Sequence, residues 1–392
     1  MQLANQTHLT FCTNLFAGEQ WQQHFAHLRQ HLPALKRRIS PDAPLGLGLR
    51  LGALAADSLS QPSQLERFRN WLEAEQCYLF TLNGFPYGPF HGTPVKQGVY
   101  RPDWSELRRR AYTLQLAEIM AALMPAGGHG SISTVPLGFR ADLAPAARHR
   151  AALDNLIHTV AALYQLERDT GRWVQLALEP EPSCVLETTA DVLKLFQQLR
   201  GQLPTLCRTL GIPMTQAEQV LHRHLGVCLD CCHCAVMFED PLESALALQR
   251  MGIPIAKVQL TAALSIDPHA DGAQAALAAL SDPIYLHQTT VRSEGETRSY
   301  LDLDQALAAL GDSPAQWRSH YHVPIFLSQM GPFRTTQKSV AQLLSHHRLD
   351  PLCPHLEVET YTYDLLPEQY RDQGVVAHLF QELSWAKEQL QG

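Results

Sequence analysis

Asp230 and His233 stand three positions apart, directly after a short apolar run, and a carboxylate with an imidazole at this spacing suits a divalent metal ion. Two other apolar runs also end on carboxylates, at Glu179 and Glu359, whereas a fourth run ends on the neutral amide of Gln259. Several such endings together indicate strands whose carboxyl ends meet at one cavity. The chemistry that they predict is metal binding by buried oxygen and nitrogen ligands.

A carboxylate at the end of a buried strand is costly unless it is paired, hydrogen-bonded or bound to a metal ion. The alternative to a metal is therefore a set of ordinary salt bridges, for which Arg50 and Lys257 lie near suitable strand ends. Arg50 also resembles an anion clamp for a substrate. His233, taken alone, would be an ordinary histidine at a helix start, and its spacing from Asp230 is what favours the ligand role.

Further polar residues are candidates for binding a metal or a substrate. His320 and His322 would face the same side of an extended segment and bind one ion together, although an exposed polar loop explains the pair equally well. His91 and Lys96 lie in a loop rich in glycine, proline and aromatic residues, where a cation or proton donor would meet a substrate; a solvated loop is the alternative. Asn14 closes the first apolar run and is a candidate to bind a substrate hydroxyl, or else a turn residue.

The elements that must position these residues follow one another in a regular alternation. Apolar runs of strand length alternate with segments whose apolar residues recur at helical spacing, and this alternation predicts a parallel α/β sheet. Eight such strands with helices between them predict a (β/α)8 TIM barrel. The expected strands are Leu9–Thr13, Leu45–Leu51, Cys77–Leu82, Ser131–Val135, Val174–Glu179, Gly226–Asp230, Ile255–Leu260 and Leu356–Thr360.

Two helix starts carry recognisable signals. Thr215–Glu218 has the form of a capping box, and its helix is expected to end at Gly226. Asp240 followed by Pro241 supplies a cap and a first-turn proline for a helix that ends before Gly252.

Two regions interrupt the alternation and are expected to lie as loops on the catalytic face. The first follows the third strand, over residues 83–104. The second, over residues 261–349, is interpreted as an insertion without a core of its own, between the seventh and eighth strands. Within it, Tyr285–His287 and Arg298–Tyr300 would form a hairpin around Ser293–Glu296.

The composition excludes some classes of function. The chain has 392 residues, which is within the range of a barrel with insertions but gives no count of domains by itself; from the strand alternation we expect one TIM-barrel domain over residues 1–392. The net charge of -7 makes a nucleic-acid partner unexpected. The first residues are polar, and no apolar run reaches the roughly 18 residues of a membrane helix, so a cytoplasmic protein is expected. The oligomeric state is left open.

Four of the nine cysteines lie between Cys228 and Cys234, too close together to join distant segments, so structural disulfides are not expected. Cys228 and Cys231 have the spacing of a zinc-binding pair, but outside residues 228–234 the chain has no second C-x-x-C pair, which disfavours structural zinc. Cys228 would share the inward side of its strand with Asp230 and is interpreted as a core thiol. A redox role for the cluster, including Cys232, is left open.

The strand ends resemble those of the xylose-isomerase-like TIM barrels, a superfamily of sugar isomerases and epimerases that also holds the endonuclease IV type of abasic-site nuclease. Glu179 resembles the metal glutamate of the fifth strand, Asp230 with His233 the aspartate and trailing histidine of the sixth, and Glu359 the glutamate of the eighth. The family usually has histidine where this chain has Gln259. A neutral amide favours a harder ion, so the resemblance implies Mn or Mg, with Zn as an alternative.

More narrowly, the whole chain resembles the EboE family of metabolite-traffic proteins, TIM barrels of a bacterial gene cluster linked to moving a small precursor toward the periplasm. This resemblance implies a small-molecule ligand and partners in a membrane-associated pathway. It rests on the motifs Cys12–Asn14, Asn83–Gly88, Val99–Trp104, Leu178–Pro182, His320–Pro324 and Glu357–Thr362.

The leading hypothesis is a metal-dependent isomerase or epimerase of sugars or sugar-like molecules, acting in the processing or traffic of a small metabolite. The resemblance implies that Glu179 and Glu359 are both ligands and the acid/base pair, one on each face of the substrate. The expected metal ligands are Glu179, Asp230, His233, Gln259, His322 and Glu359. The expected substrate-binding residues are Asn14, Arg50, His91, Lys96, Glu181, Lys257, His287 and His320.

Two other functions remain open at this point. A multinuclear phosphoester hydrolase would use His233, His287, His320 and His322 to hold additional metal ions, as the nuclease branch does. A non-catalytic metabolite carrier or scaffold would retain the barrel pocket and bind its ligand without turnover.

Overall fold

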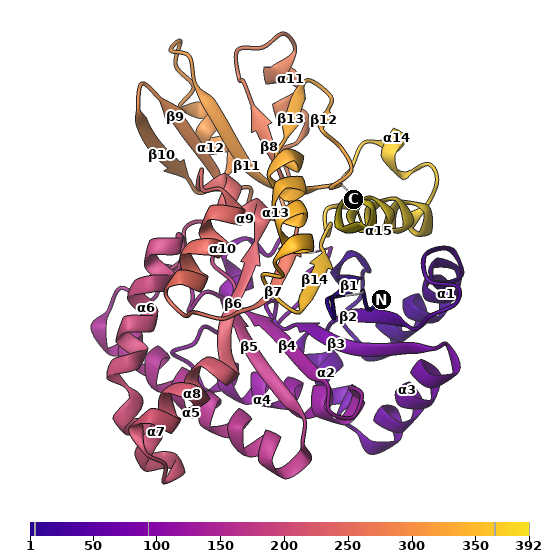
Figure 1. Cartoon of the computed structure of the whole chain (residues 1–392). Coiled ribbons are helices and arrows are strands. Elements are labelled where there is room, and N and C mark those ends of the chain that lie inside the picture. The colour runs from indigo at the N-terminus through magenta and orange to yellow at the C-terminus, as the bar shows by residue number, and fades with distance from the viewer. Residues whose placement is uncertain (4, 93, 364–365, 392) are drawn as a thin grey trace.

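The computed structural model describes residues 1–3, 5–92, 94–363 and 366–391. Its larger sheet has 8 parallel strands in the order β1-β14-β7-β6-β5-β4-β3-β2, and a parallel bridge from Cys12 to Gly48 brings the two outer strands together into a nearly closed barrel (Figure 1). The strands are β1 (His8–Phe11), β2 (Leu45–Arg50), β3 (Cys77–Asn83), β4 (His129–Thr134), β5 (Trp173–Leu178), β6 (Leu225–Asp230), β7 (Ile255–Leu260) and β14 (His355–Val358).

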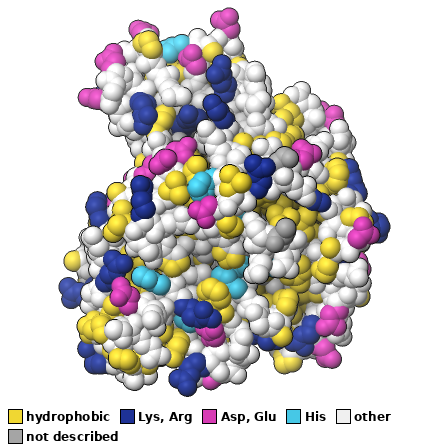
Figure 2. All heavy atoms as spheres, viewed as in Figure 1, with side chains coloured by type: hydrophobic (Ala, Val, Ile, Leu, Met, Phe, Trp, Pro, Cys, Tyr) yellow, Lys and Arg dark blue, Asp and Glu magenta, His cyan; other side chains and the backbone are white. Residues whose placement is uncertain are grey.

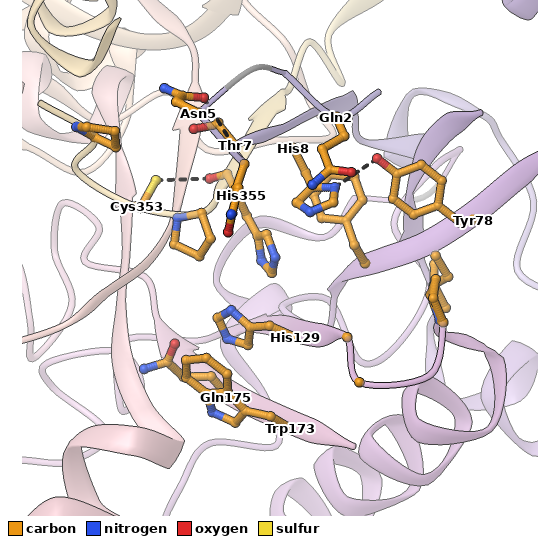
Figure 3. A pocket seen from close by; sticks show the side chains of 18 of the residues that line it. Gln2, Asn5, Thr7, His8, Tyr78, His129, Trp173, Gln175, Cys353 and His355 are labelled. Atoms are coloured by element: carbon orange, nitrogen blue, oxygen red, sulfur yellow. Dashed lines mark hydrogen bonds between the residues drawn. The ribbon is translucent and has the colours of Figure 1, made fainter. Parts of the chain in front are cut away.

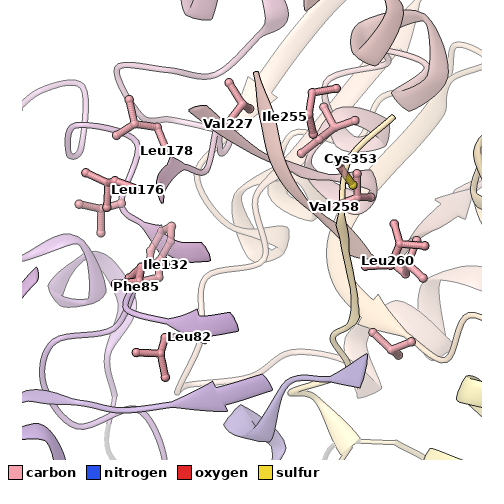
Figure 4. Packing of buried hydrophobic residues seen from close by; sticks show 14 of the residues in the cluster. Leu82, Phe85, Ile132, Leu176, Leu178, Val227, Ile255, Val258, Leu260 and Cys353 are labelled. Carbon is pink, nitrogen blue, oxygen red and sulfur yellow. The ribbon is translucent and has the colours of Figure 1, made fainter. Parts of the chain in front are cut away.

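The predicted (β/α)8 TIM barrel is confirmed, and every predicted barrel strand is present. Strands of a parallel barrel are covered on both faces, which suits continuous apolar runs. Accordingly, β2, β6 and β7 are buried at every position. Apolar side chains of neighbouring strands pack with those of the helices in one cluster, part of which Figure 4 shows around Leu82, Leu176 and Val258.

Helices cover the outside of the barrel, and consecutive ones pack against each other around it (Figure 1). The helix α13 packs between α10 and α15, in the last part of this ring. The helices are α1 (Trp21–Ile39), α2 (Ala53–Leu59), α3 (Pro62–Ala74), α4 (Leu107–Leu123), α5 (Ala146–Thr170), α6 (Thr189–Gly201), α7 (Leu203–Leu210), α8 (Met214–His224), α9 (Cys231–Val236), α10 (Pro241–Arg250), α13 (Gln337–Leu349), α14 (Glu368–Arg371) and α15 (Val375–Gln391), with the short 3-10 helices η1 (Thr13–Leu15) and η2 (Lys96–Tyr100).

One of the two predicted helix starts is confirmed and the other is wrong. Asp240 caps α10 by accepting from the backbone N–H groups of Leu242 and Glu243. The helix α8 instead begins at Met214 after Pro213, so the Thr215–Glu218 motif lies inside its first turns and caps nothing. Pro213 fixes the backbone before the helix and moves its start ahead of the motif.

Residues between β7 and α13 form a second sheet of 6 antiparallel strands, which projects from one end of the barrel (Figure 1). The predicted hairpin exists, but its first arm is β9 and not Tyr285–His287. The sheet has the order β10-β9-β11-β8-β13-β12, and its elements are β8 (Ala262–Ile266), α11 (Ala273–Ala279), β9 (Thr289–Ser293), β10 (Glu296–Tyr300), α12 (Leu303–Ala308), β11 (Gln316–Val323), β12 (Gln329–Met330) and β13 (Phe333–Thr335).

A fully buried ion pair joins two neighbouring barrel strands. Lys257 on β7 donates to Glu357 on β14 at 2.5 Å, and both side chains are 0% exposed. Gly48 makes room for the pair, because a Cβ there would lie 1.8 Å from Glu357 Oε1 and 2.7 Å from the Phe11 carbonyl oxygen. The strand β2 therefore requires glycine at this position.

Acidic and basic side chains are mixed over the face that Figure 2 shows, with apolar side chains scattered among them. Within the described residues, the helices are too short or too polar to cross a bilayer.

Candidate functional site

Three buried carboxylates meet at the carboxyl ends of the barrel strands. Glu179 follows β5, Asp230 is the last residue of β6, and Glu359 follows β14; one oxygen of each lies within 4.8 Å of the other two. The side chains are almost inaccessible, at 3%, 1% and 4% exposure. The strands place them together because parallel strands end at the same edge of the barrel.

The proximity of the three carboxylates makes their negative charge costly. Burial, followed by the charge of Asp230, raises the pKa of Glu179 well above its ordinary value. Burial and the charge of Glu179 do the same to the pKa of Glu359. Glu179 Oε2 and Asp230 Oδ2 have no hydrogen-bond partner among the described residues. A divalent cation between these oxygens would offset both the repulsion and the missing bonds.

Gln259, at the neighbouring position on β7, is the residue that stands where histidine was expected. It pairs in register with Asp230 on one side and Glu357 on the other. Its side chain is 0% exposed, and within the described part of the chain neither its Oε1 nor its Nε2 has a partner. A buried amide without partners is unfavourable, so the side-chain oxygen fits the role of an additional ligand.

Two asparagines hold Glu359 in place. Asn14 and Asn83 both donate their side-chain N–H to Glu359 Oε1, at 2.6 Å and 2.8 Å. The other oxygen, Oε2, lies 3.7 Å from His322 Nδ1. The asparagines therefore orient the carboxylate while leaving one of its oxygens for a metal or a proton.

A cluster of three histidines lies next to the carboxylates. His233 lies in α9, directly after β6, whereas His320 and His322 lie on β11 of the second sheet. The Nε2 atom of His320 lies 3.2 Å from that of His233 and 3.1 Å from that of His322. His322 Nε2 also lies 3.9 Å from Asp230 Oδ2. We call these three residues the histidine cluster.

The charges around the histidine cluster act unequally on its members. Burial and the neighbouring imidazoles lower the pKa of His320 well below its ordinary value. Burial lowers the pKa of His322 to about 4. Burial also opposes protonation of His233, but the nearby carboxylates of Asp230, Glu181 and Glu359 outweigh it and raise the pKa of that histidine.

A small cavity of about 60 Å3 lies over these residues. Aromatic rings form its roof: Phe90, Tyr285 and Tyr361 lie in mutual contact, with centroids 5.1 to 5.4 Å apart. We call these three side chains the aromatic roof. Glu179, Glu359, His233 and the two β11 histidines are among the remaining lining residues.

Four of the predicted substrate-binding residues line this cavity, namely Asn14, Lys96, Glu181 and His320. The ammonium of Lys96 is already engaged, because it donates to the carbonyl oxygens of Asp282 and Tyr285 and to Asp302 at 2.6 Å. It thereby joins the loop after β3 to the second sheet. Of the predicted metal ligands, Asp230 and Gln259 are not among the lining residues of this cavity.

The other four predicted substrate-binding residues, Arg50, His91, Lys257 and His287, lie outside the lining of this cavity. Arg50 pairs with Glu19 at 3.1 Å, and Lys257 pairs with Glu357. These two cations therefore form their ion pairs with other carboxylates. Neither of the two proposed salt-bridge partners is paired with Glu179, Asp230 or Glu359. His287 Nδ1 donates to the carbonyl oxygen of His320 at 2.8 Å and so supports β11.

Several residues of the site were not named as site candidates from the sequence. Thr261 donates to Asp230 Oδ1 at 2.7 Å, and Tyr100 donates to Glu181 at 2.8 Å. Gln288 accepts from His320 Nδ1 at 2.7 Å. Asn83 could have been recognised from the sequence, because it is an asparagine at the end of an apolar strand, as Asn14 is after β1. Thr261 and Gln288 lie in irregular connections, which have no periodic pattern.

The crowded cysteines are all free thiols. Burial raises the pKa of Cys228, Cys231, Cys232 and Cys234 well above the ordinary value. These thiols are therefore protonated and poor nucleophiles.

A second and wider hollow, of about 1570 Å3, lies at the opposite end of the barrel, where the strands begin. Figure 3 shows His8, His129, His355 and Trp173 around it, with the His129 ring stacked on Trp173 at 3.6 Å. Burial lowers the pKa of His8 to about 4 and that of His129 to about 3, so these imidazoles are neutral. The metal-type clusters of the described residues all lie at the other end.

Neither a protein-family model nor a curated protein matches the sequence, but solved structures do. A xylose isomerase-like TIM barrel protein from Mycobacterium smegmatis in complex with magnesium is 12% identical, with a TM-score of 0.53 over 100% of this chain and 98% of that one. A D-tagatose 3-epimerase-like protein is 11% identical, with a TM-score of 0.49 over 98% and 97%. The IOLI protein with a binding zinc atom is 13% identical, with a TM-score of 0.45 over 98% of each chain. This chain has the fold of the xylose isomerase-like TIM barrels.

Proposed function

We propose that this protein is a metal-dependent isomerase or epimerase that moves a proton on a small polyhydroxylated substrate. The observation that carries the proposal is the convergence of three buried carboxylates, Glu179, Asp230 and Glu359, at the carboxyl end of a TIM barrel, where Glu179 and Asp230 each have an oxygen without a hydrogen-bond partner among the described residues. Such a donor set is stable when a divalent ion compensates its charge. The same edge of the barrel is where this fold places catalytic groups.

Glu179, Asp230 and Glu359 would hold the ion, with Gln259 as a fourth ligand. Oxygen ligands favour Mn or Mg, and Zn is the alternative. When bound, the ion would polarise a substrate carbonyl or hydroxyl and stabilise the negative charge that develops on its oxygen. The rest of the chemistry falls to the side chains.

Glu179 and Glu359 would move the proton. Both carboxyl groups line the cavity, so each could exchange a proton with a bound substrate. Asn14 and Asn83 fix the orientation of Glu359, so it meets the substrate from one defined side. The aromatic roof excludes water from the reacting atoms.

The character of the cavity favours an uncharged substrate. Its one lysine, Lys96, is already paired with Asp302, and Arg50 is paired elsewhere. A phosphate group would therefore meet carboxylates and rings, with no unpaired cation among the described lining residues to receive it. Hydroxyl groups suit the carboxylates, and an apolar sugar face suits Phe90 and Tyr361.

A phosphoester hydrolase is the second candidate, because the histidine cluster offers donors for a further ion beside the carboxylates. The two candidates differ in the bond that changes. A hydrolase would cleave a phosphoester, whereas an isomerase would exchange a carbon-bound proton with solvent.

The test uses the purified full chain, loaded with Mn and incubated in deuterated water with a panel of ketoses and aldoses. We expect NMR to show deuterium at the carbon next to the carbonyl, and elemental mass spectrometry to show bound metal. Glu359→Gln should abolish exchange, and a Glu179→Gln, Asp230→Asn double variant should also lose the ion. Glu73→Gln, which alters an exposed carboxylate on α3, is the matched control.

Three results would contradict the proposal. Exchange that survives Glu359→Gln would remove that residue from the chemistry. Cleavage of bis(4-nitrophenyl) phosphate without any proton exchange would favour the hydrolase. Binding of a ligand with neither reaction would favour a non-catalytic metabolite carrier. From the resemblance to the EboE family we also propose a role in metabolite traffic with pathway partners at a membrane, and from the sequence a cytoplasmic location.

A further inference from the structure

The second sheet has one apolar face and one polar face. The apolar face includes buried residues from three of its strands, namely Leu264, Trp317 and Phe333. Each of these residues is followed by a polar one, Ser265, Arg318 or Arg334. Successive side chains of a strand lie on opposite faces, so these three polar side chains lie on the other face of the sheet.

The strand register places these side chains in one row. Arg334 of β13 pairs with Ser265 of β8, and Ser265 pairs in turn with Arg318 of β11. On its other side Arg318 pairs with Thr290 of β9, so Arg292, two residues further along β9, is a diagonal neighbour of Arg318 on the same face. The Cα atoms of such neighbours are about 7 to 8 Å apart, a distance that long side chains bridge. The register therefore gathers three arginines on the polar face.

We call Arg292, Arg318 and Arg334 the arginine group. Residues 262–335 include eight acidic residues and four arginines, and dark blue side chains gather on this projecting part of the molecule in Figure 2. Of the four arginines, only Arg298 forms an ion pair within the described chain, with Glu296 at 3.1 Å. Arg298 pairs in register with Val291, next to Arg292, and so lies on the opposite face. The arginine group thus has no carboxylate to compensate its charge among the described residues.

Two members of the arginine group contact the same aromatic ring. The Cζ atoms of Arg292 and Arg318 lie 4.0 Å and 5.5 Å from the centre of the Phe238 ring. The ring attracts each cation but does not neutralise it. Burial and the charge of Arg292 lower the pKa of Arg318, and Arg318 Nε is buried without a hydrogen-bond partner among the described residues. A bound anion would offset both the repulsion and the missing hydrogen bond.

Phe238 presents its ring from a strained backbone conformation. It follows α9 with a φ of 58°, in the left-handed region where a helix usually ends on glycine. Its N–H donates to the Ala235 carbonyl oxygen at 3.0 Å, and the N–H of Glu239 donates to that of Cys234 at 2.8 Å. A strained residue persists where the surrounding contacts hold it. The two guanidinium groups supply such contacts for Phe238.

We propose that Arg292, Arg318 and Arg334 form a binding site for a phosphate group, separate from the cavity over the carboxylates. None of the three is among the lining residues of that cavity. Guanidinium groups present paired N–H donors that match phosphate oxygens, and a dianion compensates two neighbouring cations. Arg334 and the hydroxyl of Ser265 would bind the same group from the other end of the row.

The phosphate group can belong to a larger molecule. Arg292 and Arg334 are exposed and Arg318 is half-buried, so the remainder of a phosphate monoester would extend into solvent. Free phosphate offers the same oxygens. The chemistry that the arginine group recognises is common to both ligands.

The test is isothermal titration calorimetry of the purified full chain with inorganic phosphate and with phenyl phosphate, at low ionic strength. We expect one phosphate per chain, and the tighter of the two probes identifies the free ion or the monoester as the occupant. Arg292→Gln and Arg318→Gln should each weaken binding about 10-fold or more, because each removes charge-assisted hydrogen bonds. Arg298→Gln removes the same charge from the opposite face and should bind as wild type does.

Two further measurements separate this site from metal binding and from folding. The Glu179→Gln, Asp230→Asn double variant should still bind phosphate, which excludes an ion at the carboxylates as the acceptor. Phosphate should raise the Tm of wild type but not that of Arg318→Gln, whose Tm without phosphate should equal or exceed that of wild type.

Three results would overturn the proposal. The first is a wild-type chain that binds neither probe at millimolar concentration. The second is an equal loss of binding in Arg298→Gln and Arg318→Gln, which would indicate attraction by net charge alone. The third is acetate binding as tight as phosphate binding, since a monoanion leaves one of the two neighbouring cations uncompensated.

Discussion

At the scale of the residue, Glu359 depends on partners that are not themselves ligands. Asn14 and Asn83 use the same carboxylate oxygen, and Asn83 comes from a strand that supplies none of the carboxylates. Such supporting bonds usually change metal affinity about 10- to 100-fold when they are lost.

Asn83→Leu removes one of these donors with little change in volume. We expect metal affinity at the carboxylates to fall about 10-fold or more, since Glu359 loses its fixed orientation. Competition against a fluorescent chelator measures the affinity. Asn70→Leu, at an exposed position on α3, serves as the control, and equal affinities for the two variants would show that Asn83 has no such role.

His347 on α13 predicts how stability depends on pH. Its Nδ1 accepts from the Leu352 backbone N–H at 3.2 Å, and its Nε2 bonds Thr7 at 3.0 Å. Burial lowers its pKa from 6.5 to about 4. Because the unfolded chain takes up this proton first, stability is lost as the pH falls from about 6.5 toward 4.

Urea unfolding at pH 7 and pH 5 tests this reasoning. The free energy of unfolding of wild type should fall between these pH values by about 1 to 2 kcal/mol more than that of His347→Asn. Asparagine keeps an acceptor near the position of Nδ1 but does not titrate. The comparison cancels the opposite effect of Glu179 and Glu359, whose raised pKa values stabilise the fold at low pH. Identical losses in the two proteins would contradict the prediction.

At the scale of the element, the loop after β3 is held by one buried cation. Arg109 on α4 donates to the carbonyl oxygens of Pro102 at 2.7 Å, Gly84 at 2.9 Å and Phe85 at 3.1 Å. These acceptors lie at the two ends of the loop that carries Phe90. Burial lowers the pKa of Arg109 to about 10, which still leaves it charged at neutral pH.

Arg109→Met should loosen this loop and destabilise the fold by about 3 kcal/mol, because three buried carbonyl oxygens lose their donor. Limited proteolysis should then cut between residues 84 and 104 at a protease concentration that leaves wild type intact. Arg108→Met, at the exposed neighbouring position, should behave as wild type does. Cleavage elsewhere, or no cleavage, would show that Arg109 does not secure the loop.

The sequence predicted the barrel better than the insertion, for a physical reason. Barrel strands are buried on both faces, so they appear as apolar runs that end on polar residues. Strands such as β10, which is exposed at four of its positions, lack that pattern and are found only through their turn. The two histidines of β11 were recognised by their spacing. Their contact with His233 was not foreseeable, because it depends on how the second sheet sits on the barrel.

At the scale of the whole molecule, the second sheet and the barrel share their buried surface. Leu264, Trp317 and Val323 belong to the same cluster of buried apolar residues as the barrel strands. We therefore propose that the chain unfolds as one domain, in line with the single barrel domain that the alternation of strands and helices predicts. The ordered site of Asp230, His233 and the β11 histidines exists only when the two sheets are docked.

The reactivity of the nine free cysteines tests whether the barrel and the insertion open together. Seven are buried, and burial also raises the pKa of the partly exposed Cys234, whereas Cys207 is partly exposed on α7. A thiol reagent at pH 8 should label Cys207 quickly and the other eight only when the chain opens. Cys207→Ser should remove the fast phase. Rapid labelling of several thiols in the native protein would show that barrel and insertion open separately.

The aromatic roof has a consequence for timing. A cavity of about 60 Å3 holds a few water molecules, far less than a sugar. Phe90 comes from the barrel loop, Tyr285 from the insertion and Tyr361 from the segment after β14, so a ligand larger than the cavity would have to displace contacts among three parts of the chain. We expect the rate of this displacement to limit how quickly such a molecule enters and how long it stays bound.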